Sequence, residues 1–184
     1  MSDAAPAVAF RRLAPDDLQQ VFLWLLQPHV VRGYAPAPSS FMEVVAKYGP
    51  RTQDDNVVKA FVFSVDAADA GYIQAYDLAH FPEYASQIGA ASGIACVDLF
   101  IGEEKLTGWG IGTRVLRRFV DEVVFAWEGV AACVAGPAEG NLASIRAFEK
   151  AGFSRWKIVK PPGGASECVM RRERETVRIT QSAP

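Results

Sequence analysis

The sequence has few cysteines and histidines and no surplus of basic residues. Its three cysteines, Cys96, Cys133 and Cys168, lie far apart and form no C-x-x-C pair or Cys/His cluster, which argues against a zinc site or a disulfide framework. The 19 basic and 21 acidic residues give a net charge of −2. Contacts with nucleic-acid phosphates require a basic surplus, so we expect no nucleic-acid partner. A mildly acidic protein suits a cationic small molecule instead.

Long apolar runs are also missing. No segment approaches the ~20 apolar residues of a membrane-spanning helix, and residues 1–10 contain neither a basic leader nor a secretory apolar stretch. We therefore expect a cytoplasmic protein without a membrane partner, and the sequence leaves monomer and homodimer open. The 184 residues, half of them apolar, suit one soluble domain over 1–184. Its core is expected at about 8–172, with a frayed tail at 175–184.

The spacing of the apolar residues predicts a mixture of strands and helices. Strands are expected at 8–13, 59–65, 71–78, 96–101, 130–135, 154–159 and 167–172. Helices are expected at 16–26, 110–127 and 141–151, and a further helix through Tyr48 is expected after a cap at Ser39 or Ser40. Pro28 is expected to end the first helix, and residues 29–40 and 79–92 are expected to be loops. This order predicts an α+β fold with a mostly antiparallel central sheet, flanking helices and one local β-α-β unit.

A glycine-rich turn lies between the expected strand at 96–101 and the long helix that follows. Gly108, Gly110 and Gly112 alternate with other residues, so the backbone can approach a ligand while the first N–H groups of the helix point toward it. This arrangement is typical of an anion site, although a turn needed only for tight packing is the alternative. The pattern lacks the G-x-G-x-x-G spacing of dinucleotide-binding proteins and the Lys-Ser/Thr pair of a P-loop.

Two segments resemble the Gcn5-related N-acetyltransferases (GNAT). Thr107-x-x-Gly110-x-Gly112 is similar to their pyrophosphate loop, Q/R-x-x-G-x-G/A, with Thr107 in place of glutamine or arginine. Residues 141–153 resemble the family's N-x-x-A-x-x-x-[YF]-x-K-x-G-F segment, with Phe148 at the aromatic position. The resemblance spans nearly the whole chain. It implies an acyltransferase that uses acetyl-CoA as co-substrate and needs no metal.

The resemblance also places the co-substrate. It implies that pantetheine lies between the strands at 96–101 and 131–135, and that diphosphate binds to the backbone of residues 108–113. The residues implied to contact acetyl-CoA are Phe100, Ile101, Gly108, Trp109, Gly110, Ile111, Gly112, Thr113, Asn141, Phe148 and Lys150.

Within the superfamily, the chain is most similar to the aminoglycoside 6′-N-acetyltransferases. The similarity lies in residues 71–76, 97–103 and 145–153, and it implies that Asp98 binds or deprotonates the acceptor amine. A carboxylate suits this role because the acceptor is an ammonium ion in water and only the free amine can attack a thioester. The neighbours of Asp98 are apolar, so its carboxylate should face a polar cleft; an ordinary surface aspartate is the alternative. The expected acceptor-binding residues are Tyr34, Gln74, Tyr76, Asp77, Asp98 and Glu139.

Three positions depart from these relatives. Phe148 stands where they have a tyrosine suited to reprotonating the CoA thiolate, and phenylalanine cannot donate a proton. Gly136 and Gly163 stand where acidic residues line the relatives' aminoglycoside pocket. Four carboxylates are candidates to compensate, unless they are solvated surface charges: Asp77, Glu83, Glu139 and Glu167.

The sequence therefore predicts transfer of an acetyl group to the 6′-amine of an aminoglycoside by direct attack in a ternary complex. An acetyltransferase for another small amine, a siderophore precursor or a protein N-terminus is one alternative, which the missing carboxylates favour. A CoA-binding module without catalysis is a second alternative, which Phe148 favours.

Overall fold

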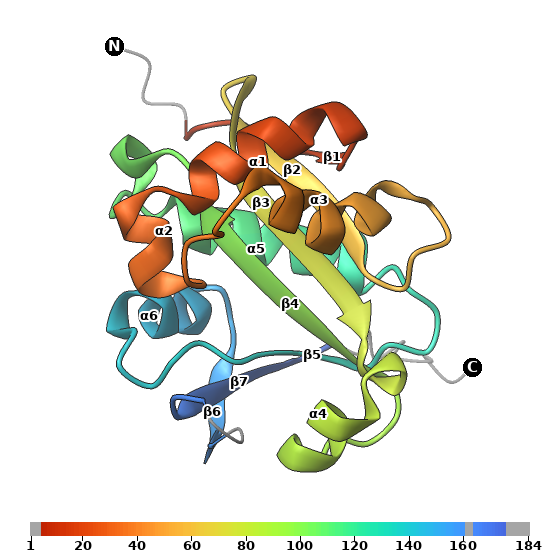
Figure 1. Ribbon diagram of the computed structural model, residues 1–184. Helices are drawn as coiled ribbons and strands as arrows, with labels where there is room; N and C mark the ends of the chain where they lie inside the picture. Colours follow the sequence, from red (N-terminus) through yellow and green to blue (C-terminus); the bar gives the residue numbers. More distant parts are fainter. Residues whose placement is uncertain (1–4, 161–163, 176–184) are drawn as a thin grey trace, which may run out of the picture.

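The computed structural model describes residues 5–160 and 164–175, and these residues build one seven-stranded sheet (Figure 1). The strand order is β1-β2-β3-β4-β5-β7-β6, and the one parallel pair within the described residues is β4 with β5. The α+β fold with a mostly antiparallel sheet is therefore confirmed. The strands are β1 (Val8–Arg12), β2 (Lys59–Val65), β3 (Ala68–Asp77), β4 (Ile94–Ile101), β5 (Ala132–Ala135), β6 (Ser154–Val159) and β7 (Glu167–Glu173).

Helices cover both faces of this sheet. On one face, α1 (Leu18–Leu25), α2 (Pro28–Gly33) and α3 (Phe41–Tyr48) lie in front of the central strands in Figure 1. On the other face, α5 (Ile111–Phe119) and α6 (Leu142–Lys150) enclose the largest apolar core. The short α4 (Pro82–Ile88) packs near β6, on the same face as α1 to α3.

Local sequence signals account for the helices that were predicted. The buried residues of α5 are Ile111, Val115, Leu116 and Phe119, and this spacing places them on one side of a helix. The hydroxyl of Ser40 caps α3 by accepting a hydrogen bond from the backbone N–H of Glu43.

Two predicted loops were wrong, because each contains a helix. Residues 29–40 include most of α2, and residues 79–92 include all of α4. Pro28 and Pro82 both occupy the first helical turn, where the missing N–H costs nothing and the fixed φ favours the helix. A proline that appeared to stop one helix therefore starts the next. The α-helix expected at 110–127 is also shorter than predicted, because it passes into a π turn at Val120–Val124.

The two central parallel strands separate partway along their length. β4 pairs with β5 only from Ile94 to Cys96, opposite Ala132 to Val134. Beyond this point β4 continues to Ile101, whereas β5 ends at Ala135 and pairs on its other side with β7. The strands therefore open a gap in the sheet beside Asp98, the position that was expected to face a cleft.

Some expectations concern residues that the structure does not describe. Residues 176–184, most of the expected tail, and Gly163 lie outside the described residues. Within 5–160 and 164–175, no helix is both long enough and apolar enough to cross a bilayer.

Candidate active site

A cavity of about 290 Å³ lies where β4 and β5 separate. Val97 and Phe148 line it from the face covered by α5 and α6, whereas Tyr34, Asp98 and Glu167 line it from the opposite face. The cavity therefore connects the two faces of the sheet. Two ligands that approach from opposite faces can meet inside it.

Asp98 is held in this cavity by a residue of the neighbouring strand. Gln74 on β3 lies directly opposite Asp98 in the strand register, and its Nε2 donates a hydrogen bond of 2.8 Å to Asp98 Oδ2. The amide oxygen of Gln74 accepts hydrogen bonds from Tyr72 Oη at 2.7 Å and from Arg51 Nη1 at 2.5 Å. These two donors orient the Gln74 amide so that its NH₂ group points to Asp98. Among the described residues, Asp98 accepts no other hydrogen bond from a side chain, which leaves Oδ1 for a ligand.

The surroundings make Asp98 a better proton acceptor than an exposed aspartate. Burial raises the pKa of Asp98, while the hydrogen bond from Gln74 and the charges of Arg51 and Lys47 oppose this rise. The Asp98 carboxylate thus lies near the positive charges of Arg51 and Lys47. Within the described residues it forms no ion pair with either of them. Burial also raises the pKa of Tyr34, so this phenol at the cavity wall stays protonated at neutral pH.

Aromatic and histidine contacts fix the strand end beyond Asp98. The Phe100 ring stacks on Tyr72 at 5.4 Å and meets the edge of Tyr34 at 4.9 Å between centroids. The Phe100 side chain is thus buried on the face opposite α5, and any contact with acetyl-CoA would come from its backbone. His29 Nε2 donates to the carbonyl of Ile101 at 2.8 Å, a structural role for which the sequence gave no signal.

The glycine-rich turn leaves its backbone open to a ligand. Gly108 has φ +80° and Gly110 has φ +78°, and a Cβ atom added to either would meet nothing within 4 Å. Gly110 is the N-cap of α5. The N–H groups of the first turn lack partners within the helix, so a diphosphate fits here without competing for an existing hydrogen bond. Trp109, which is 82% exposed, borders the same open space.

Comparison with known proteins agrees with this arrangement. The family model described as an acetyltransferase (GNAT) domain matches residues 14–160. The chain belongs to the GNAT acetyltransferase family. The chain is also similar to the aminoglycoside N(6′)-acetyltransferase type 1 of Klebsiella pneumoniae, with 26% identity over 184 residues that cover 99% of this chain and 90% of that protein.

Solved structures of similar proteins match the same fold. A crystal structure of aminoglycoside acetyltransferase AAC(6′)-Ib with coenzyme A is 25% identical, with a TM-score of 0.77 over 91% of this chain and 95% of that chain. A second structure, with coenzyme A and kanamycin, is also 25% identical and has a TM-score of 0.76 over the same shares.

The other residues implied to contact acetyl-CoA in this GNAT protein lie at α5 and α6. Thr113 Oγ1 donates to the carbonyl of Ala147 at 3.4 Å, which ties the two helices together. Asn141 caps α6 by accepting from the Ser144 N–H, and its Nδ2 donates to the carbonyl of Gly33 at 3.1 Å. Ile111 is buried, Gly112 is half-buried and Lys150 is exposed. The contacts of these residues with acetyl-CoA stay predictions.

The structure brings together only some of the predicted acceptor-binding residues. Tyr34 and Asp98 line the cavity, and Gln74 holds Asp98 from behind. The other three do not line it. Tyr76 packs its ring against Phe81 at 4.4 Å, the Asp77 carboxylate caps a turn by accepting from the Ala79 N–H, and Glu139 is exposed.

Sequence reasoning found one residue of this site only weakly and missed another. Glu167 lines the cavity but was only one of four candidate carboxylates. Arg51, which lies close enough to influence the pKa of Asp98, was missed. It occupies a 3-10 turn at Gly49–Thr52, and its spacing gives no local signal.

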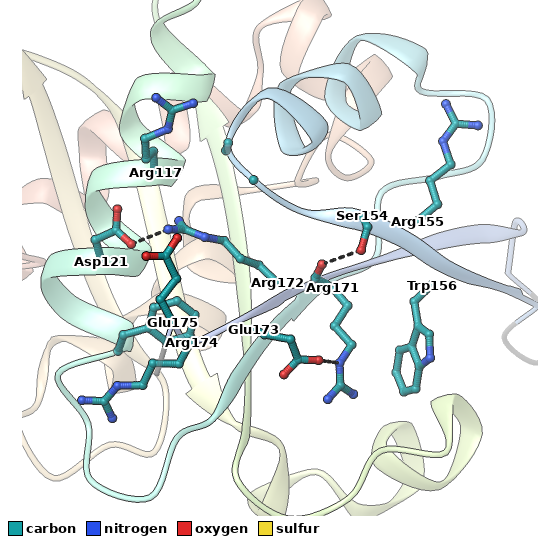
Figure 2. Close-up of a pocket in the computed structure, with 13 residues that line it drawn as sticks. Arg117, Asp121, Ser154, Arg155, Trp156, Arg171, Arg172, Glu173, Arg174 and Glu175 are labelled. Atoms are coloured by element: carbon teal, nitrogen blue, oxygen red, sulfur yellow. Dashed lines mark hydrogen bonds and ion pairs between the residues drawn. The ribbon is translucent and has the colours of Figure 1, made fainter. Parts of the chain in front are cut away.

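A second hollow, of about 940 Å³, lies between the end of α5 and strands β6 and β7 (Figure 2). Several arginines line it, and acidic residues pair with three of them: Arg172 with Asp121 at 2.5 Å, Arg171 with Glu173 at 2.6 Å and Arg155 with Glu149 at 2.8 Å. Among the described residues it shares no lining residue with the cavity at Asp98. The two hollows are therefore separate. No group of three or more potential metal ligands occurs among residues 5–160 and 164–175.

Proposed function

We propose that this GNAT protein transfers the acetyl group of acetyl-CoA to the 6′-amine of an aminoglycoside. The observation that carries the proposal is the half-buried Asp98 carboxylate in a cavity that passes through the sheet where β4 and β5 separate. The aminoglycoside acetyltransferase names of the similar proteins support the same acceptor class.

The cavity and the glycine-rich turn fit the two substrates on separate sides. Acetyl-CoA supplies an activated acetyl thioester, and its diphosphate suits the N–H groups at the start of α5. Its pantetheine arm would follow the gap between β4 and β5 from the face that bears Phe148. The acceptor would enter on the face that bears Tyr34 and Asp98. Both substrates are then present together, as direct transfer requires.

Asp98 would act on the acceptor amine before and during the attack. The carboxylate attracts the ammonium ion and accepts one of its protons, directly or through water. The freed nitrogen lone pair attacks the thioester carbonyl carbon, so a C–N bond forms and the C–S bond breaks. The second proton lost by the nitrogen passes through water to the departing thiolate, because Phe148 has no proton to give.

A thioester-cleavage assay with a panel of acceptors tests this function. Kanamycin and tobramycin are compared with simple monoamines at equal concentration, and the acetylated position is read by mass spectrometry and NMR. We expect turnover of the aminoglycosides with acetylation at the 6′-amine. Turnover confined to the simple amines would favour an acetyltransferase for another small amine.

The described residues also favour a smaller acceptor as the second candidate. Asp98 and Glu167 are the carboxylates among the described lining residues of the cavity, and Gly136 supplies no charge. Tight binding of acetyl-CoA without turnover of any amine would instead indicate a CoA-binding module.

A further inference from the structure

Glu167 occupies space that a side chain at residue 136 would otherwise fill. A Cβ atom added to Gly136 would lie 2.6 Å from Glu167 Oε2 and 2.6 Å from Tyr84 Oη. These distances are shorter than any real Cβ contact. Only glycine at this position therefore allows the Glu167 carboxylate to reach the cavity in its present place.

Tyr84 fixes the position of this carboxylate. Its hydroxyl donates to Glu167 Oε2 at 3.2 Å, which joins α4 to the start of β7. Gly136, in the turn after β5, lies against both side chains. Glu167 is half-buried, and within residues 5–160 and 164–175 no lysine or arginine forms an ion pair with it. Burial raises the pKa of Glu167, and the negative charge of Asp98 raises it further.

Two carboxylates in one cavity are costly to ionise together unless a cation lies beside each of them. Asp98 is already assigned to the reacting ammonium ion. Glu167 lines the same cavity and forms no ion pair within the described residues. A second positive charge on the acceptor would stabilise the ionised form of its carboxylate.

We propose that Glu167 binds a second ammonium group of the acceptor. The Tyr84 hydroxyl holds its carboxylate in place, and the missing side chain of Gly136 leaves room for it. The acceptor class is accordingly a molecule with at least two amines, one that reacts at Asp98 and one that pairs with Glu167. This inference rests on the proposed acetyltransferase function and narrows its substrate.

The test compares two acceptors with the same skeleton, one bearing an amine and the other a hydroxyl at a single position away from the reacting amine. The wild type should prefer the diamine in kcat/KM by about tenfold or more, as expected for a charge-assisted contact. Glu167→Gln should bring this ratio close to one, mainly through a higher KM for the diamine. Tyr84→Phe should lower the ratio by a smaller factor.

Gly136→Ala gives a second route to the same outcome. Its methyl group would lie 2.6 Å from Glu167 Oε2 and from Tyr84 Oη, which must both shift, so this variant should reduce the preference. The double variant should lose no more of the preference than Glu167→Gln alone, because both changes act through the same carboxylate. Glu83→Gln is the matched control, because Glu83 is exposed on α4 beside Tyr84 and should leave the ratio unchanged.

The proposal is overturned if Glu167→Gln remains folded, as judged by its melting curve, and keeps the wild-type preference for the diamine. If the wild type acetylates no amine at all, the proposed function fails. Calorimetry with the same two acceptors in the presence of coenzyme A then measures the contribution of Glu167 to acceptor binding, independently of turnover. A diamine preference in Kd that Glu167→Gln abolishes supports the second cation site, and equal binding of both acceptors contradicts it.

Discussion

Gln74 Nε2 donates a hydrogen bond of 2.8 Å to Asp98 Oδ2 across the β3–β4 pair. Gln74 is 6% exposed, and both ends of its amide are engaged, since its oxygen accepts from Tyr72 and Arg51. The orientation of the proposed catalytic carboxylate is therefore set by a buried amide that cannot turn over without breaking its hydrogen bonds to Asp98 and Arg51. This relationship makes the protonation of Asp98 sensitive to Gln74.

Gln74→Met should move the acidic limb of the pH profile of kcat/KM to higher pH. The hydrogen bond from Gln74 stabilises the ionised carboxylate and so lowers the pKa of Asp98. Methionine has a similar length but no N–H donor, and the pKa should rise further. Activity should therefore fall most at low pH. Gln53→Met, at an exposed position, is the control, and an identical limb in the Gln74 variant would contradict the role of this contact.

Asp98→Asn should make the protein more stable to heat at pH 7. The folded pKa of Asp98 is raised, chiefly by burial, so its stabilising contribution is complete below the unfolded pKa and is lost as pH rises through the folded pKa. Asparagine resembles the neutral acid and escapes this loss. The difference in melting temperature should shrink as the pH falls toward about 4. If the variant melts below the wild type at pH 7, the hydrogen bond from Gln74 and the charges of Arg51 and Lys47 fully offset the cost of burying the ionised carboxylate.

Gly110→Asp should weaken binding of acetyl-CoA by about tenfold or more, because it places a negative charge beside the expected diphosphate. Gly110 has φ +78°, a conformation that aspartate and asparagine tolerate better than most residues. Gly110→Asn therefore introduces a side chain of the same shape as aspartate without its charge. This variant should bind acetyl-CoA much more tightly than Gly110→Asp does. Calorimetry at low and high salt measures the difference, which salt should reduce. Equal affinities for the two variants would mean that no anion binds there.

Gly102→Ala should destabilise the fold by about 1–3 kcal/mol, the usual cost of overpacking. A Cβ atom at residue 102 would lie 2.3 Å from the ring of Trp24, which is buried and donates through Nε1 to Glu103 at 3.1 Å. Gly140→Ala is the matched control, because a Cβ atom there would meet nothing within 4 Å. Urea unfolding of both variants measures the effect, and equal midpoints would show that Trp24 moves aside freely.

The fold was predictable because its main elements carry strong local patterns. The apolar spacing of α5 and the capping serine of α3 are local signals, and the glycine-rich turn indicated where a strand passes into a helix. The two missed helices, α2 and α4, are six and seven residues long. Each begins at a proline, which from sequence alone indicates a break as readily as a start.

The site was only partly predictable because some of its contacts join distant segments. Asp98 was identifiable as a carboxylate within an apolar strand, and its strand neighbour Gln74 was included with it. Arg51 and Glu167 reach the site only through tertiary packing. The fit between Gly136 and Glu167 depends on the turn after β5 lying beside the start of β7, and no spacing in the sequence indicates it.

The proposed reaction depends on the Asp98 carboxylate, which drives attack of an acceptor amine on acetyl-CoA. Steady-state thioester cleavage with kanamycin should therefore be measured for the wild type and for Asp98→Asn at saturating acetyl-CoA. Turnover by Asp98→Asn should be lower on the order of 10²–10⁴-fold, with the Kd for acetyl-CoA unchanged within about threefold. If Asp98→Asn turns over kanamycin at the wild-type rate, Asp98 does not drive the reaction.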